Sequence, residues 1–238
     1  ARMMILQGHR LGWEMHVYSE NSHDPAAKVT RFWHQGSLNN RTRLEKFIQQ
    51  MHVTTFESEF LDARLLMDIE KDVGGTILPR PITMEQLQDR LKQKNQLLKN
   101  KIPTADFVEW KPSRTWTAMK QMYPKGFVIK QRRNGYDGYG TFMIRTKRDY
   151  EAFCQRPANE FGYIAEILVP FKRELSIICA RNRKGDFVNL PLVESFQKSS
   201  RCFWVKGPVQ HKAERALRRR VHAFLNRLNY VGVIAFEL

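Results

Sequence analysis

The chain has 238 residues, which is enough to bury the core of one large domain or two ordinary ones. Hydrophobic residues make up 42% and charged residues 27%, ordinary values for a globular protein that argue against disorder. No apolar run reaches the roughly 18 residues of a membrane span and no secretion signal is visible, so a soluble cytoplasmic protein is expected. The net charge of +16 favours anionic partners, which could be nucleotides, phosphorylated metabolites or nucleic acid.

The first part of the chain alternates helical and strand-like patterns. Residues 1–12 are predicted to be helical and end in glycine, and residues 13–17 alternate apolar with polar side chains as a half-buried strand does. A second helix is expected over residues 41–50, where Leu44, Phe47 and Ile48 share a face, followed by a strand over 52–56. This alternation indicates a small α/β unit with a parallel sheet.

Proline and glycine residues interrupt the pattern before residue 83. Thr83 and Gln86 have the spacing of a capping box, and Leu87, Leu91, Lys94 and Leu98 lie along one face of the helix that follows. The helix is expected to end at Pro103. We therefore place a domain boundary between Gly75 and Thr83, with an N-terminal domain over 1–80 and a second domain over 81–238.

The second half is expected to be rich in strands. The predicted strands cover residues 127–130, 140–145, 163–169, 174–181, 187–192 and 231–236. Residues 182–186 read as a hairpin turn. A helix over 211–228 should bury Leu217, Val221, Phe224, Leu225 and Leu228, and expose Arg215, Arg218 and Arg219. A core face with a solvated basic face explains this helix better than a nucleic-acid-binding stripe.

The three cysteines do not indicate a metal or disulfide site. Cys154, Cys179 and Cys202 are an odd number and have no CxxC spacing. We expect them to be reduced and buried.

The segment KQRRNGYDGYG, residues 130–140, carries the clearest chemical signal. Gly135, Gly138 and Gly140 would let peptide N–H groups approach an anion closely. The spacing fits neither a P-loop nor a Rossmann turn, and a glycine-rich hairpin also occurs without any function. A mobile hairpin with a lysine at the end of its first strand is what the residues themselves indicate.

Several stretches in order resemble one family of enzymes. They are LQGHRLGWEMHVYSENSHDPAAKVT, QDRLKQK, KQRRNGYDGYG, AEILVPFKRELSIICAR, PLVES and YVGVIAFE. Together they resemble the N5-carboxyaminoimidazole ribonucleotide synthetases, which are ATP-grasp enzymes. The resemblance implies an α/β fold, α+β in the second half. Its parts would be a Rossmann-like sheet domain lacking its first strand and an ATP-grasp region cut short at its C-terminal end.

The resemblance implies roles for particular side chains. Lys130 would contact ATP phosphates, Arg90 would reach the nucleotide, and residues 135–141 would close over the phosphates. Tyr136 and Asp137 would face the aminoimidazole substrate, which makes them catalytic candidates with Lys130. The cofactor-binding set would comprise Arg90, Lys130, Gly135, Tyr136, Asp137, Gly138, Tyr139, Gly140, Thr141, Glu166, Ile167, Leu168, Val169, Glu174 and Gln197.

Two carboxylates in this set would serve the ribose and a metal. Glu174 would accept hydrogen bonds from ribose hydroxyls, although the residues alone equally allow an exposed acid paired with Arg173 or Lys172. Glu237 would bind Mg²⁺, which prefers oxygen ligands and commonly joins one or two carboxylates to substrate phosphates. The implied cofactors are ATP and Mg²⁺.

The implied reaction is an ATP- and bicarbonate-dependent carboxylation. Bicarbonate would form carboxyphosphate, and the amine of 5-aminoimidazole ribonucleotide would take the carboxyl group, in purine biosynthesis. Catalysis of this reaction would depend on positioning the reactants and neutralising the phosphate charge. The expected partners are therefore small molecules, with no nucleic acid and no membrane, and the family also suggests a homodimer.

The sequence departs from the family pattern in three ways. The chain starts after the family's first strand and stops before a second metal carboxylate, so magnesium binding and turnover by these residues alone are expected to be poor. Tyr139 stands where the family has a lysine or arginine, and Gln197 where it usually has a histidine. A degenerate ATP-grasp protein that binds a nucleotide without chemistry is therefore one alternative, and a basic nucleic-acid-binding protein is another.

Overall fold

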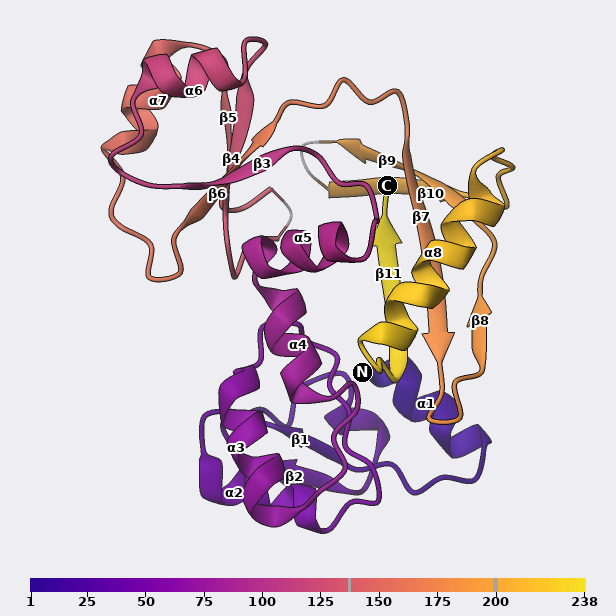
Figure 1. Cartoon of the computed structure of the whole chain (residues 1–238). Coiled ribbons are helices and arrows are strands. Elements are labelled where there is room, and N and C mark those ends of the chain that lie inside the picture. The colour runs from indigo at the N-terminus through magenta and orange to yellow at the C-terminus, as the bar shows by residue number, and fades with distance from the viewer. Residues whose placement is uncertain (137, 199–200) are drawn as a thin grey trace. The chain divides into compact units, whose positions relative to one another are not determined.

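A computed structural model describes residues 1–136, 138–198 and 201–238 of the chain (Figure 1). The chain divides into two compact units, Ala1–Glu85 and Gln86–Leu238. Each unit has its own hydrophobic core, so each is described by itself.

The first unit is a small α/β unit. Its elements are α1 (Arg2–Arg10), β1 (Val17–Ser19), the 3-10 helix η1 (Ala27–Val29), β2 (Trp33–Gln35), α2 (Arg41–Gln49) and α3 (Ala63–Val73). Strands β1 and β2 pair in parallel, which confirms the predicted parallel sheet. The Asn40 side chain caps α2 by accepting from the N–H of Arg43, and Leu44, Phe47 and Ile48 are buried as predicted.

Three local predictions in this region were wrong. The strand predicted over 13–17 begins only at Val17, because only there does β2 offer a partner. Residues 52–56 form no strand beyond a single bridge between Thr54 and Ile77. Helix α4 (Pro81–Gln88) starts at Pro81, whose fixed φ suits the first turn, so Thr83 lies inside the helix and cannot begin a capping box.

The second unit opens with α5 (Arg90–Lys99) and a four-stranded sheet. Strands β3 (Phe107–Trp110), β4 (Phe127–Gln131), β5 (Thr141–Ile144) and β6 (Tyr163–Ile167) follow the order β3-β6-β4-β5 and are all antiparallel. Helices α6 (Trp116–Met122) and α7 (Lys147–Cys154) contribute Met119, Tyr150 and Phe153 to the core beneath this sheet. Strand β3 and helices α6 and α7 were not predicted from the sequence.

A second antiparallel sheet completes this unit. It contains β7 (Glu174–Arg181), β8 (Phe187–Asn189), β9 (Val193–Lys198), β10 (Arg201–Lys206) and β11 (Gly232–Glu237), in the order β10-β9-β7-β11 with β8 against β7. Helix α8 (Glu214–Arg227) packs on one face through Val221, Phe224 and Leu225. The predicted 182–186 turn is confirmed by the hydrogen bond from the Asn182 N–H to the Asp186 carbonyl.

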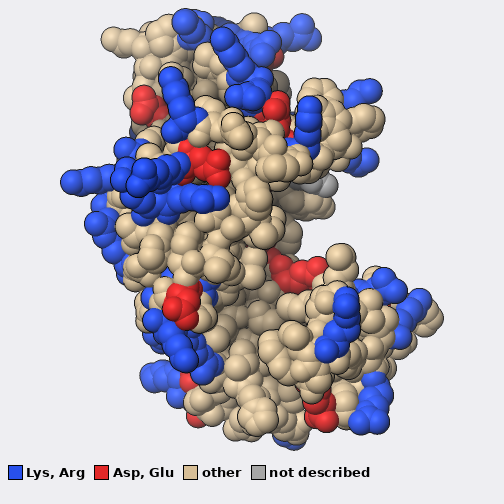
Figure 2. All heavy atoms as spheres, turned by 90° about the vertical axis from the view of Figure 1, so that its right-hand side faces the viewer, with Lys and Arg blue, Asp and Glu red and all other residues tan. Residues whose placement is uncertain are grey.

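The basic residues of α8 lie on its solvent side. Arg215, Arg218 and Arg219 are exposed, as predicted. Figure 2 shows the molecule from the right-hand side of Figure 1, the side on which α8 lies. In this view, basic side chains cover far more of the surface than acidic ones.

The cysteine prediction was only partly right. Cys179 is buried, but Cys154 and Cys202 are exposed. Cys154 ends α7 and Cys202 lies on β10, whose six residues are all exposed, so neither has a core to enter. Over the described residues, no helix combines the length and the apolar character needed to cross a membrane.

Candidate functional site

Lys130 and Glu166 form an ion pair across neighbouring strands. Lys130 lies near the end of β4 and Glu166 on β6, and Val128 is the direct neighbour of Glu166 in the ladder. The Nζ of Lys130 donates to Oε2 of Glu166 at 2.8 Å. The Glu166 side chain is 8% exposed and that of Lys130 is 30% exposed, so the lysine is the member that solvent reaches.

Lys94 is a second cation on the same carboxylate. Its Nζ lies 3.3 Å from Oε1 of Glu166 and also donates to Thr104 Oγ1 at 2.7 Å and to the Ala105 carbonyl at 3.1 Å. Burial lowers the pKa of Lys94, and the Glu166 charge only partly offsets this. No role for Lys94 was predicted from the sequence. Its position on the apolar face of a helix was the available signal, because a buried lysine needs a partner.

Arg90 holds the base of the glycine-rich loop. Its N–H donates to the Arg132 carbonyl at 2.9 Å, its Nε to the Gln131 carbonyl at 3.0 Å and its Nη2 to the Gly135 carbonyl at 3.1 Å. These hydrogen bonds do not test the predicted contact between Arg90 and a nucleotide. They place the guanidinium directly beside the loop.

Arg132 anchors the same loop to the start of α5. Its Nε and Nη2 donate to the two carboxylate oxygens of Asp89 at 3.0 and 2.6 Å. Asp89 also caps α5 by accepting from the N–H groups of Leu91 and Lys92. Burial alone would raise the pKa of Asp89, but Arg132 and these N–H groups offset it, and the pKa lies below its ordinary value. Neither residue was singled out from the sequence.

The loop itself presents aromatic rings to solvent. Tyr136 and Tyr139 are 57% and 66% exposed, and their rings stack with centroids 5.7 Å apart. Gly138 and Gly140 have positive φ values of 77° and 74°, which glycine adopts readily. The Thr141 N–H donates to the Gly138 carbonyl at 3.1 Å. Asp137 lies outside the described residues.

The segment expected to line an adenine follows β6. Ile167 ends that strand, Leu168 donates its N–H to the Gly126 carbonyl at 3.4 Å, and Val169 is 45% exposed. The Glu166 side chain is committed to the two lysines. The Ile167 N–H also donates to the Asp106 carbonyl and the Val169 carbonyl accepts from the Phe171 N–H, so a ligand here would use the other backbone groups between Ile167 and Val169.

Glu174 and Glu237 bring two carboxylates together. Glu237 pairs with Ser176 on β7, which puts it diagonally across from Glu174. Burial raises the pKa of Glu174, and repulsion from Glu237 raises it further. Of the two cations that the alternative pairs with Glu174, Arg173 or Lys172, Arg173 instead contacts Glu194 at 3.6 Å, and Glu174 is half-buried rather than exposed.

These two carboxylates fit a magnesium ion that nucleotide phosphates also bind. A divalent cation would relieve their repulsion, and carboxylate oxygens are the ligands it prefers. Among the described residues, no cluster of three or more histidine, cysteine or acidic side chains could hold a metal. Any ion at Glu174 and Glu237 would therefore complete its shell with phosphate oxygens and water.

Gln197 lies on β9, two residues along from Ser195, which pairs with Glu174. Alternate residues of a strand share a face, so Gln197 lies on the same face of the sheet as Glu174. The sequence-predicted residues thus fall into four groups: Lys130 with Glu166, residues 167–169 at and after the end of β6, Arg90 with the loop, and Glu174 with Glu237 and Gln197.

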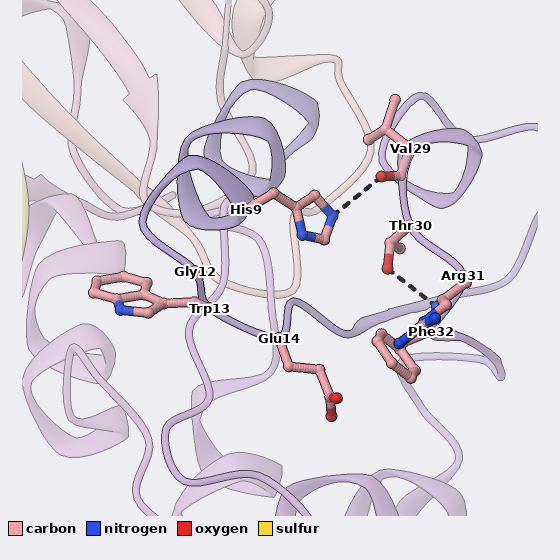
Figure 3. Close-up of a pocket in the computed structure, with 8 residues that line it drawn as sticks. All are labelled: His9, Gly12, Trp13, Glu14, Val29, Thr30, Arg31 and Phe32. Atoms are coloured by element: carbon pink, nitrogen blue, oxygen red, sulfur yellow. Dashed lines mark hydrogen bonds between the residues drawn. The ribbon is translucent and has the colours of Figure 1, made fainter.

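A separate hollow of about 510 Å³ lies in the first unit (Figure 3). In Figure 3, His9 points toward the Val29 carbonyl, 3.3 Å away, whereas Trp13 points away from the other residues drawn. None of the sequence-predicted site residues lines it.

Two family models match the chain. The ribonucleotide synthetase preATP-grasp domain model matches residues 1–88, and the ATP-grasp domain model matches residues 95–238. The second match covers more than half of the chain.

Curated relatives and solved structures agree with these models. The N5-carboxyaminoimidazole ribonucleotide synthase of Synechococcus elongatus is 29% identical over all of this chain and 60% of its own length. The synthetase structure from Thermotoga maritima has a TM-score of 0.82 at 26% identity, over 99% of this chain and 60% of that one. The Staphylococcus aureus synthetase complexed with ADP has a TM-score of 0.90 at 21% identity, over 99% and 62%. The chain thus spans about 60% of the length of these relatives.

Proposed function

Because this chain belongs to the ATP-grasp family, we propose that it supplies the nucleotide-binding part of an N5-carboxyaminoimidazole ribonucleotide synthase. The observation that carries the proposal is the solvent-accessible Lys130 ammonium at the end of β4, directly before the loop that Arg90 clamps. An ammonium and a glycine-rich loop together suit the phosphates of ATP.

The proposed roles follow the four groups of residues. Lys130 and the N–H groups of residues 135–141 bind the phosphates, with Tyr136 and Asp137 toward the aminoimidazole substrate. The backbone of Ile167, Leu168 and Val169 holds the adenine. Glu237 holds Mg²⁺ with Glu174 beside it, and Gln197 lies on the same sheet face as Glu174, which would support the nucleotide.

The reaction needs charge neutralisation more than covalent help from the protein. An oxygen of bicarbonate attacks the γ-phosphorus of ATP, and the bond to ADP breaks, which gives carboxyphosphate. The amine of 5-aminoimidazole ribonucleotide then attacks the carboxyl carbon, and phosphate leaves as the amine loses a proton. Mg²⁺ supplies charge neutralisation at the phosphates when it is bound, and Lys130 and the loop amides hold their oxygens in place.

The test uses the longest natural chain that contains these residues. It measures ADP release with Mg²⁺ and bicarbonate, with and without 5-aminoimidazole ribonucleotide, alongside calorimetric titration of MgATP. We expect the ribonucleotide to raise ADP release. Lys130→Met should weaken MgATP binding by tenfold or more, since a hydrogen bond to a charged group is worth about 1.5–3 kcal/mol. Lys125→Met is the matched control, because Lys125 is an exposed lysine just before the same strand. Equal affinities in the two variants would refute the role of Lys130.

One observation favours a second function. The Tyr139 ring stacks on Tyr136 at a position where the resembling family carries a cation. A relative that binds the nucleotide without carboxylating a ribonucleotide would show MgATP binding but no bicarbonate-dependent ADP release.

Three further expectations stay predictions. A domain boundary between residues 80 and 81, a cytoplasmic location and a homodimer are each consistent with the proposed enzyme. Sedimentation of the purified chain would test the homodimer directly.

A further inference from the structure

Glu166 is a single buried carboxylate that two lysines share. Lys94 approaches one of its oxygens at 3.3 Å and Lys130 the other at 2.8 Å. Two ammonium groups against one carboxylate leave a surplus positive charge beside the glycine-rich loop. Arg90 adds to it, because it lies close enough to Lys94 to lower the pKa of that lysine, after the larger effects of burial and Glu166.

The two lysines are held very differently. The Lys94 ammonium has three hydrogens and three acceptors, Glu166, Thr104 and the Ala105 carbonyl, and its side chain is only 9% exposed. Lys130 contacts Glu166 and is 30% exposed. Lys94 is therefore fixed in place, whereas Lys130 can leave Glu166 for an anion from solvent.

We propose that Lys94 is a positioning residue for Lys130: it neutralises Glu166 and so leaves the Lys130 ammonium available to nucleotide phosphates. Without Lys94, the buried carboxylate would have Lys130 as its main counter-charge and would hold it tightly, because a buried carboxylate without a partner is costly. A phosphate would then have to compete with Glu166 for Lys130. This inference rests on the proposed function.

The inference predicts an unusual pattern of variants. Lys94→Met should weaken MgATP binding by about tenfold, and Lys94→Arg should stay within about threefold of the wild-type chain. The double variant Lys94→Met with Glu166→Gln should recover to within about threefold, because Lys130 no longer has a carboxylate to hold it. Lys99→Met on the same helix is the control, since Lys99 is exposed.

Calorimetric titration of MgATP into each variant measures these affinities, and circular dichroism checks that each variant folds. A purely structural role for Lys94 predicts that the double variant binds as weakly as Lys94→Met or worse, and that result would overturn the inference. Equal binding by Lys94→Met and Lys99→Met would overturn it as well, while leaving the proposed function standing.

A second measurement works without nucleotide. Competitive acetylation followed by mass spectrometry gives the rate at which Lys130 reacts, and we expect it to fall in Lys94→Met and to recover in the double variant. If the wild-type chain binds no MgATP, the proposed function is wrong and acetylation alone decides the effect of Lys94 on Lys130. An unchanged Lys130 rate in Lys94→Met would then overturn the inference.

Discussion

The pair of Asp89 and Arg132 provides the sharpest test of how the loop is anchored. Asp89 is 3% exposed and accepts two hydrogen bonds from Arg132. Removing one partner of a buried ion pair costs about 3–5 kcal/mol. Asp89→Asn keeps the shape and the cap of α5, and Arg132 keeps Glu109 at 3.1 Å. We therefore expect this variant to lose about 2–3 kcal/mol in the free energy of unfolding.

Arg132→Met should cost more, about 3–5 kcal/mol, because it leaves the buried Asp89 carboxylate without its main partner. Urea unfolding followed by circular dichroism measures both variants. Lys111→Met is the control, since Lys111 pairs with Glu109 at 3.8 Å with a side chain that is 64% exposed. An exposed pair of this kind contributes about 0–1 kcal/mol. If the Asp89 and Lys111 variants lose equal stability, the reasoning from burial is refuted.

The same pair predicts an acid-dependent loss of stability. The pKa of Asp89 lies below its ordinary value of 3.8 in the folded chain, the net result of burial, which raises it, and Arg132, which lowers it. Its ionised form therefore contributes stability that is fully present above that ordinary value and is lost as the pH falls through the folded value. The free energy of unfolding of Asp89→Asn should fall less steeply below about pH 4 than that of the wild-type chain. Parallel slopes would contradict this assignment.

Three further outcomes are expected. Gly126→Ala should lower the free energy of unfolding in urea by about 1–2 kcal/mol more than Gly185→Ala does. Both residues have positive φ, but a Cβ at Gly126 would lie 2.9 Å from a backbone carbonyl oxygen, whereas one at Gly185 would lie 3.6 Å from its nearest neighbour. Equal losses of stability in the two variants would refute this steric explanation. Glu237→Gln should lower the pKa of Glu174 toward its ordinary value in an NMR titration, because repulsion from Glu237 is one of the two effects that raise this pKa, after burial. An unchanged pKa of Glu174 would show that the two carboxylates do not interact. Burial raises the pKa of Cys179 to about 11, so this thiol should react with a disulfide reagent only after unfolding. The exposed Cys154 and Cys202 should react at once. Rapid reaction of all three thiols in the folded chain would refute the burial of Cys179.

Patterns that are complete within a short stretch were predicted well from the sequence. The strand over 174–181 matches β7 residue for residue, because the turn after it is marked by Gly185 and Asn182. The apolar face of α8 was also predicted well, with Val221, Phe224 and Leu225 buried and Leu217 and Leu228 partly buried, since a helical period is visible in any segment long enough to repeat it. The strand expected over 13–17 failed because an alternating pattern does not say where the partner strand lies.

The candidate site was predictable only in part, for the same reason. Lys130 and the glycines stand together in one segment, so they could be found from the residues. Lys94 meets Glu166 only through the fold, since 72 residues separate them, and Asp89 lies 43 residues from Arg132. Ion pairs of this kind leave at most one trace in a sequence, a charged residue on a face that is otherwise apolar.

The pairing of β7 with β11 sets the order in which the second unit can form during synthesis on the ribosome. Glu237 pairs with Ser176, and the α8 core residue Phe224 packs against Phe236. The four-stranded sheet is complete at Ile167, and β8 and β9 follow β7 closely, but about 50 residues separate the end of β7 from β11, its partner on the other edge. Contacts so distant in sequence form late and slowly. The nascent chain therefore carries an unpaired β7 edge for that interval, and a chaperone that shields exposed strands has most to act on there.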